Sequence, residues 1–104
     1  MSWETLREHL PKSYSPQDQA LVRRAYEFAD AAHTGQRRKS GEPYIIHPET
    51  VASILADLRL DARTVSAALL HDVAEDTPNK VPVLIEEFGP EVASMVDGVT
   101  KLEH

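Results

Sequence analysis

Residues 67–77 read AALLHDVAEDT, an apolar run that ends in a histidine and three carboxylates. Ionisable groups of this kind avoid burial unless they are paired or bound to a metal, so packing alone does not explain them. On a helix, His71 and Glu75 lie one turn apart, as do Asp72 and Asp76, and such pairs share a face. Adjacent side chains diverge by about 100°, so an ion in the wedge between His71 and Asp72 is within reach of both. The segment predicts a helix that carries half of a hydrolytic metal site.

Helical signals continue on both sides of this segment, and no stretch predicts a strand. Ser15 is a good N-cap with Pro16 at the first helical position, and Gly35 is a favourable stop. Asp61 is expected to cap the helix that carries His71. We therefore expect an all-α fold with helices at about 2–9, from Pro16 toward Gly35, from His47–Pro48 through Leu58, and at 62–74, 80–88 and from Pro90 onward.

The composition is that of an ordinary globular domain with an acidic balance. The 104 residues are 41% hydrophobic and 27% charged, with a net charge of −6. That charge argues against nucleic acid and anionic membranes as partners, and no apolar run approaches the ~20 residues of a membrane span. Because cysteine is absent, any metal must be bound by imidazole, carboxylate and water. The lack of cysteine and of a secretory signal fits a cytoplasmic protein.

One cluster of basic residues is an exception to the net negative charge of the chain. Arg37, Arg38 and Lys39 follow one another between Gly35 and Gly41. A basic loop on an acidic chain suggests a specific anionic ligand. Charge runs are more often solvated surface, however, and charge alone favours that interpretation.

His47 has two interpretations. It precedes Pro48 and is either an N-cap or a metal ligand, and histidine is a mediocre N-cap. Together with His71 and Asp72 it gives two imidazoles and a carboxylate, a donor set that suits Mn, Fe or Zn more than Mg or Ca.

The remaining ionisable residues divide into two groups. Glu75 and Asp76 come at a predicted helix C-terminus, where the macrodipole disfavours negative charge, so a nearby cation is expected. His9 and His33 lack such company, and we expect structural or surface roles for them.

Three blocks of sequence, in this order and spacing, resemble one known family. They are RRKSGEPYIIHP at 37–48, AALLHDVAEDT at 67–77, and FG at 88–89 followed by DGVTKL at 97–102. Over about residues 21–102 the chain resembles the N-terminal HD hydrolase domain of bacterial RelA/SpoT proteins, the guanosine tetra- and pentaphosphate enzymes of the stringent response. The resemblance implies an all-α, HD-domain-like helical bundle.

The resemblance also implies an activity, a Mn²⁺-dependent removal of the 3′-pyrophosphate from the guanine nucleotides (p)ppGpp, with other divalent transition metals as alternatives. The residues that match the family's metal ligands are His47, His71 and Asp72. Those that match its water-positioning carboxylates are Glu75 and Asp76. Those that match its nucleotide contacts are Arg38, Lys39 and Ser40. Because the HD and ED pairs are all present, the parent is expected to be bifunctional, with GTP pyrophosphokinase activity as well.

The extent of the chain departs from the family pattern. We expect residues 1–102 to be the N-terminal part of the HD domain and 103–104 to be a tag remnant, so that the bundle is incomplete at its C-terminal end. The resemblance places a fourth ligand, an aspartate, beyond this part, so the chain alone is expected to be weak or inactive. A truncated helical domain also exposes apolar faces that favour self-association.

Two alternatives stay open from the sequence. One is a stand-alone small alarmone hydrolase with a similar HD core. The other is a non-catalytic helical module that binds a nucleotide or a partner protein, against which the intact His71, Asp72, Glu75 and Asp76 argue.

Overall fold

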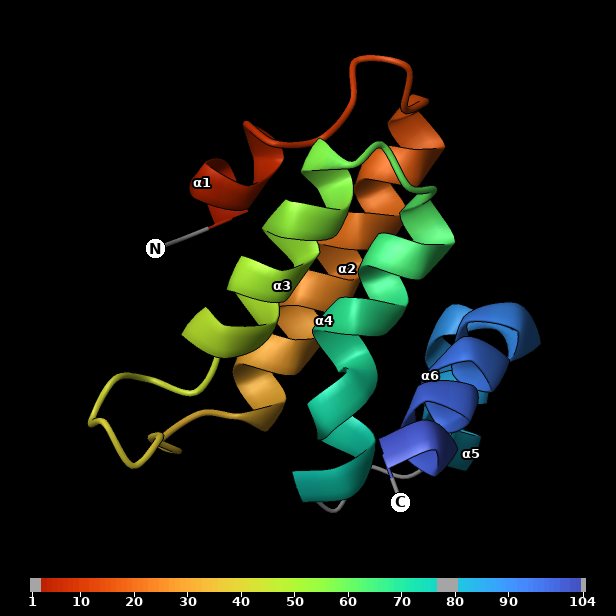
Figure 1. Cartoon of the computed structure of the whole chain (residues 1–104). Helices are drawn as coiled ribbons and strands as arrows, with labels where there is room; N and C mark the ends of the chain where they lie inside the picture. The colour runs from red at the N-terminus through yellow and green to blue at the C-terminus, as the bar shows by residue number, and fades with distance from the viewer. Residues whose placement is uncertain (1–2, 77–80, 104) are drawn as a thin grey trace.

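The computed structural model describes residues 3–76 and 81–103, with side chains described except for those of 74–76, 81 and 99–103. All elements in these ranges are helices (Figure 1), so the predicted all-α class is confirmed. They are α1 (Trp3–Arg7), α2 (Pro16–Ala32), α3 (Ile46–Asp57), α4 (Ala62–Asp76), α5 (Val81–Phe88) and α6 (Pro90–Glu103). No described helix is long and apolar enough to cross a membrane.

Helix α4 is the central element, because it packs against α2, α3 and α6 (Figure 1). Its apolar residues Val65, Leu69, Leu70 and Val73 are all fully buried. Small residues on the neighbouring helices, such as Ala25 of α2, allow close approach of the backbones. Helix α5 packs on α6, on the side of α4 away from α3. The segment AALLHDVAEDT therefore lies in the middle of the fold, and its polar end lies at one end of the bundle.

Local signals set most of the helix boundaries. Ser15 caps α2 in a reciprocal capping box with Asp18, as its predicted N-cap role requires. Asp61 accepts a hydrogen bond at 3.0 Å from the Thr64 backbone, which confirms it as the cap of α4. Gly89 takes a φ of 89° between α5 and α6, where a stop was expected.

Several helix boundaries differ from the predictions. Helix α1 ends at Arg7 instead of His9, and α2 ends at Ala32, before the expected stop at Gly35. Helix α4 extends to Asp76 instead of ending near 74. Helix α3 begins at Ile46, with Ile45 at the cap position, so His47 is not an N-cap but lies in the first turn. The prediction that α5 begins at Lys80 falls on a residue outside the described ranges, and the described helix begins at Val81.

Candidate functional site

The predicted metal ligands come from two neighbouring helices. His47 lies in the first turn of α3, and His71 and Asp72 lie near the end of α4. Asp72 Oδ2 is 4.0 Å from His47 Nε2, and Asp72 Oδ1 is 3.2 Å from His71 Nδ1. The Asp72 side chain is 10% exposed, whereas that of His47 is 38% exposed, so the group opens to solvent on the His47 side. The fold thus brings together three residues that are separated in the sequence.

The donor types and one of the two separations suit a divalent metal. Two ligand atoms at about 2.1 Å from one ion lie roughly 3.0–3.4 Å apart at octahedral or tetrahedral angles. The 3.2 Å pair fits that range, and the 4.0 Å pair exceeds it. Among the described side chains, no group of three or more such residues has the geometry of a metal site. The metal centre therefore stays a prediction.

The predicted catalytic carboxylates lie outside the described side chains. Glu75 and Asp76 belong to the last turn of α4. Their backbone position, one turn after His71 and Asp72, is the helical spacing from which their role was predicted.

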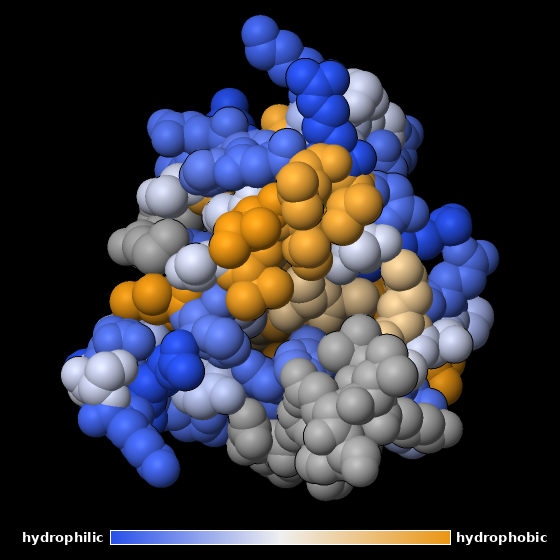
Figure 2. Space-filling model, in the orientation of Figure 1, coloured by the Kyte–Doolittle hydropathy of each residue, from blue (hydrophilic) through white to orange (hydrophobic). Residues whose placement is uncertain are grey.

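A pocket of about 430 Å³ adjoins the three candidate ligands. His47, His71 and Asp72 supply its ionisable groups. The remaining wall is mainly apolar and comes from three helices, with Val51 and Leu55 of α3, Ala67 and Ala68 of α4, and Met95 of α6. Figure 2 shows the apolar surface that gathers in the middle of the molecule, in the same orientation as Figure 1. Groups of this kind beside an apolar pocket are a common form of ligand site.

The basic cluster lies on a short hairpin between α2 and α3. Gln36 and Tyr44 pair at its base, where the Tyr44 backbone N–H donates to the Gln36 carbonyl at 3.0 Å. Above them Arg37 and Pro43 form an isolated bridge, and the Arg38 N–H donates to the Glu42 carbonyl. We call residues 36–44 the basic hairpin.

The predicted nucleotide contacts are all exposed on this hairpin. These contacts are Arg38, Lys39 and Ser40. Together with Arg37 and Tyr44, they line an open hollow of about 490 Å³. The backbone of this segment is ordered by hydrogen bonds between its two sides, while its basic side chains are exposed, so both the ligand and the solvated-surface interpretations remain open.

Sequence reasoning missed three buried or half-buried residues near these groups. Glu49, in the first turn of α3, is fully buried, and that burial raises the pKa of its carboxyl. Burial and the nearby Glu49 carboxyl raise the pKa of Tyr26. Tyr44 stacks on His33 with ring centroids 4.5 Å apart. None carries a local signal, since each depends on contacts between segments distant in the sequence.

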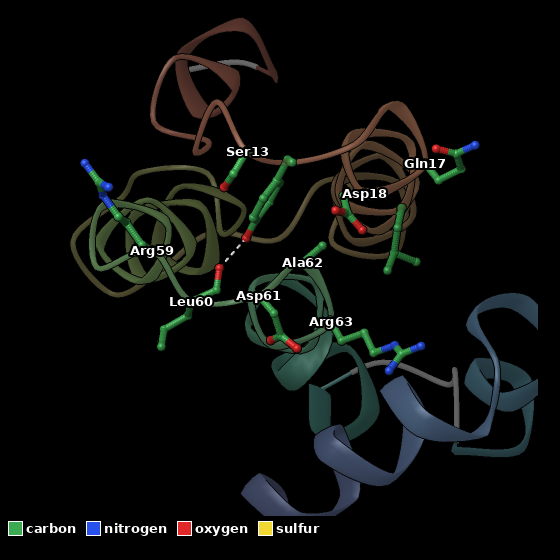
Figure 3. A pocket seen from close by; sticks show the side chains of 10 residues that line it. Ser13, Gln17, Asp18, Arg59, Leu60, Asp61, Ala62 and Arg63 are labelled. Atoms are coloured by element: carbon green, nitrogen blue, oxygen red, sulfur yellow. Dashed lines mark hydrogen bonds between the residues drawn. The ribbon is translucent and has the colours of Figure 1, made fainter.

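A second pocket lies at the opposite end of α4 (Figure 3). Its volume is about 580 Å³, and its lining includes Asp18, Asp61 and the Tyr14 ring. The Tyr14 hydroxyl donates to the Leu60 carbonyl, and burial together with Asp61 and Asp18 raises the pKa of Tyr14 to about 12. At 1.5 Å per helical residue, this pocket lies about 15 Å from His71. It therefore belongs to the packing of the helix ends and not to the candidate metal centre.

Comparison with known proteins gives one family and several long relatives. A family profile described as HD domain matches residues 25–104. The chain is 53% identical over 97 residues to a probable GTP pyrophosphokinase of Mycobacterium leprae, which covers 93% of this chain and 12% of that protein. It is 51% identical over 102 residues to the bifunctional (p)ppGpp synthase/hydrolase SpoT of Escherichia coli K12, which covers 97% of this chain and 14% of that protein.

A third relative is named for the hydrolytic reaction alone. The chain is 51% identical over 100 residues to a guanosine-3′,5′-bis(diphosphate) 3′-pyrophosphohydrolase of Aquifex aeolicus, covering 94% of this chain and 14% of that protein. The chain thus spans only 12–14% of the length of these curated relatives. The similarities agree with the predicted family and do not favour either alternative.

Proposed function

Since this chain belongs to the HD-domain family, we propose that it supplies a divalent-metal hydrolase site that removes the 3′-pyrophosphate of ppGpp and pppGpp. One observation carries the proposal: His47 of α3 lies beside the His71–Asp72 pair of α4, and all three residues line one pocket. The names of its relatives supply the substrate class, because they describe (p)ppGpp hydrolases and GTP pyrophosphokinases. We further propose that the parent is bifunctional, as one of those names states.

Membership of the HD-domain family implies a divalent metal cofactor, and we propose Mn²⁺. His47, His71 and Asp72 would hold it, since two imidazoles and a carboxylate suit a transition metal better than Mg²⁺ or Ca²⁺. When bound, such an ion supplies a Lewis acid that lowers the pKa of a coordinated water.

The side chains of this chain divide the remaining tasks. Asp72 is nearly buried between the two histidines, so its charge is held where a cation would be stabilised. Glu75 and Asp76, one turn further along α4, are proposed to orient the attacking water and accept its proton. The apolar wall of the pocket excludes bulk water from part of the site, which strengthens the electrostatic interactions there.

The substrate is proposed to be held by the basic hairpin. Arg38 and Lys39 are exposed cations on an otherwise acidic chain, and Ser40 adds a hydroxyl beside them. A guanidinium can pair with two phosphate oxygens or stack on a base, so Arg38 is suited to a guanine nucleotide.

The proposal is tested with the full-length natural protein that contains this sequence. Purified protein is incubated with ppGpp with and without Mn²⁺, and pyrophosphate and GDP are measured. The expected result is Mn²⁺-dependent release of both. Absence of release from an intact, metal-loaded protein would contradict the proposed function.

Three further predictions remain proposals. We propose that residues 1–102 form one part of the HD domain. We also propose that the protein is cytoplasmic, and the absence of cysteine supports this localisation.

Self-association of the chain is also proposed, and the exposed apolar side chains of Ile54 and Leu58 on α3 support it. Sedimentation velocity over a range of concentrations tests it, and a monomer throughout would contradict it.

A further inference from the structure

His33 is buried at the C-terminal end of α2, with 3% of its surface exposed. Two contacts of its ring are with the base of the basic hairpin, a hydrogen bond and a stacking contact. His33 Nδ1 donates to the Gln36 side-chain oxygen at 3.0 Å. Its face stacks on the Tyr44 ring, at 4.5 Å between centroids and 23° between planes. One buried ring therefore contacts the residue at which the hairpin begins and the residue at which it ends.

Backbone hydrogen bonds join the same residues. The Gln36 N–H donates to the His33 carbonyl at 2.9 Å, and the Tyr44 N–H donates to the Gln36 carbonyl at 3.0 Å. His33 Nε2 has no hydrogen-bond partner among the described residues. The orientation of the ring is thus set by Gln36 and Tyr44, and the ring in turn fixes their positions.

From the base of the hairpin, the contacts lead to both halves of the candidate site. Tyr44 lines the hollow that carries the basic side chains. Its ring also meets the His47 ring edge to face at 6.4 Å, and the His47 N–H donates to the Tyr44 carbonyl at 3.1 Å. Tyr44 therefore links the basic hairpin both to His33 and to the His47 end of α3.

We propose that His33 is a positioning residue that holds the basic hairpin against α3 so that its cations meet the phosphates of the nucleotide. The inference rests on the proposed function for the identity of that nucleotide. His33 itself touches neither substrate nor metal. Its loss is expected to weaken substrate binding while leaving the metal ligands in place, because His47 is fixed by α3 and His71 by α4.

The test compares His33→Ala with His33→Phe in the full-length natural protein, using Mn²⁺ and ppGpp. His33→Ala should raise KM about tenfold, equivalent to about 1.4 kcal/mol, while kcat and Mn²⁺ affinity change less than about twofold. His33→Phe keeps a ring against Tyr44 and should restore KM to within about threefold. His9→Ala is the matched control, because His9 is exposed and pairs with Asp57, away from the hairpin.

Four results would overturn the inference. The first two concern folded His33→Ala: an unchanged KM, or a loss of kcat together with Mn²⁺ affinity. The third is a His33→Phe variant whose KM rises as much as that of His33→Ala. The fourth is an equal rise of KM in His9→Ala. If His33→Ala does not fold, Gln36→Ala removes one contact of the ring without emptying a buried site. That variant should raise KM about threefold with kcat unchanged, and no rise would overturn the inference.

A readout independent of activity separates this inference from the proposed function. Trypsin cleaves after Arg37, Arg38 and Lys39, and cleavage there should be several-fold faster in His33→Ala than in wild type or His33→Phe. If wild type does not hydrolyse ppGpp, the proposed function fails, and the cleavage rates alone decide whether His33 positions the hairpin. Equal rates in all three proteins would then refute it.

Discussion

Replacement of Asp61 by alanine should destabilise the chain, because this residue caps the helix that carries His71 and Asp72. Its carboxylate accepts the Thr64 N–H at 3.0 Å, and its carbonyl accepts the Val65 N–H at 3.1 Å. Loss of an N-cap typically costs about 1 kcal/mol. The carboxylate's interaction with the helix dipole contributes about 0.3–1 kcal/mol, toward the low end for an exposed group. Asp61→Ala should therefore cost about 1 kcal/mol and Asp61→Asn less than half of that.

The pH dependence distinguishes the charge from the hydrogen bond. The hydrogen bond from Thr64 lowers the pKa of Asp61 below its ordinary value of 3.8. A lowered folded-state pKa means that the charge stabilises the fold fully above the unfolded value and progressively less as pH falls through the folded one. The free energy of unfolding of wild type should therefore exceed that of Asp61→Asn by a constant amount near neutral pH. This difference should decrease toward zero below about pH 4.

Urea unfolding of this chain, followed by circular dichroism at several pH values, measures these differences. A domain of this size is expected to unfold in one cooperative step. Asp61→Ala within about 0.3 kcal/mol of wild type at pH 7 would refute the capping argument. A difference between wild type and Asp61→Asn that persists unchanged at pH 3 would refute the assignment of the charge effect to Asp61.

Three other predictions follow from the structure and the proposed site. Arg59 follows Leu58, the C-cap of α3, and has a φ of 62°, so Arg59→Gly should raise the free energy of unfolding by about 0.5–1 kcal/mol; a loss of stability in urea unfolding would contradict this. Arg38→Ala should raise KM for ppGpp at least tenfold with unchanged Mn²⁺ affinity, and an unchanged KM would leave Arg38 as solvated surface. Glu75→Gln or Asp76→Asn should retain Mn²⁺ and lower kcat about 10²–10⁴-fold; loss of metal would instead make that residue a ligand.

The helices were predictable because their signals are local. Ser15 with Pro16, Asp61 before α4, and Gly89 between α5 and α6 each act within a few residues of a helix end. Two features had no local signal. Helix α3 begins before His47 although no side chain caps it, and Arg59 takes a left-handed conformation that glycine or asparagine usually adopts.

The candidate site was predictable in part for a similar reason. His71 and Asp72 are adjacent in sequence, and their position after an apolar run indicated a candidate metal site. His47 could be joined to it only through the motif pattern, because the packing of α3 on α4 is what brings the two helices together. The contact of His33 with Tyr44 had no sequence signal, since a buried histidine and a surface histidine look alike in one sequence.

The most direct test of the account measures metal content and ppGpp hydrolysis together in the full-length natural protein and in its His71→Ala variant. The wild-type protein should bind Mn²⁺ and release pyrophosphate from ppGpp, and His71→Ala should lose bound metal and hydrolysis together. His71→Ala that retains both, or a metal-loaded wild type that leaves ppGpp intact, would contradict the claim that His47, His71 and Asp72 form the metal centre of a (p)ppGpp hydrolase.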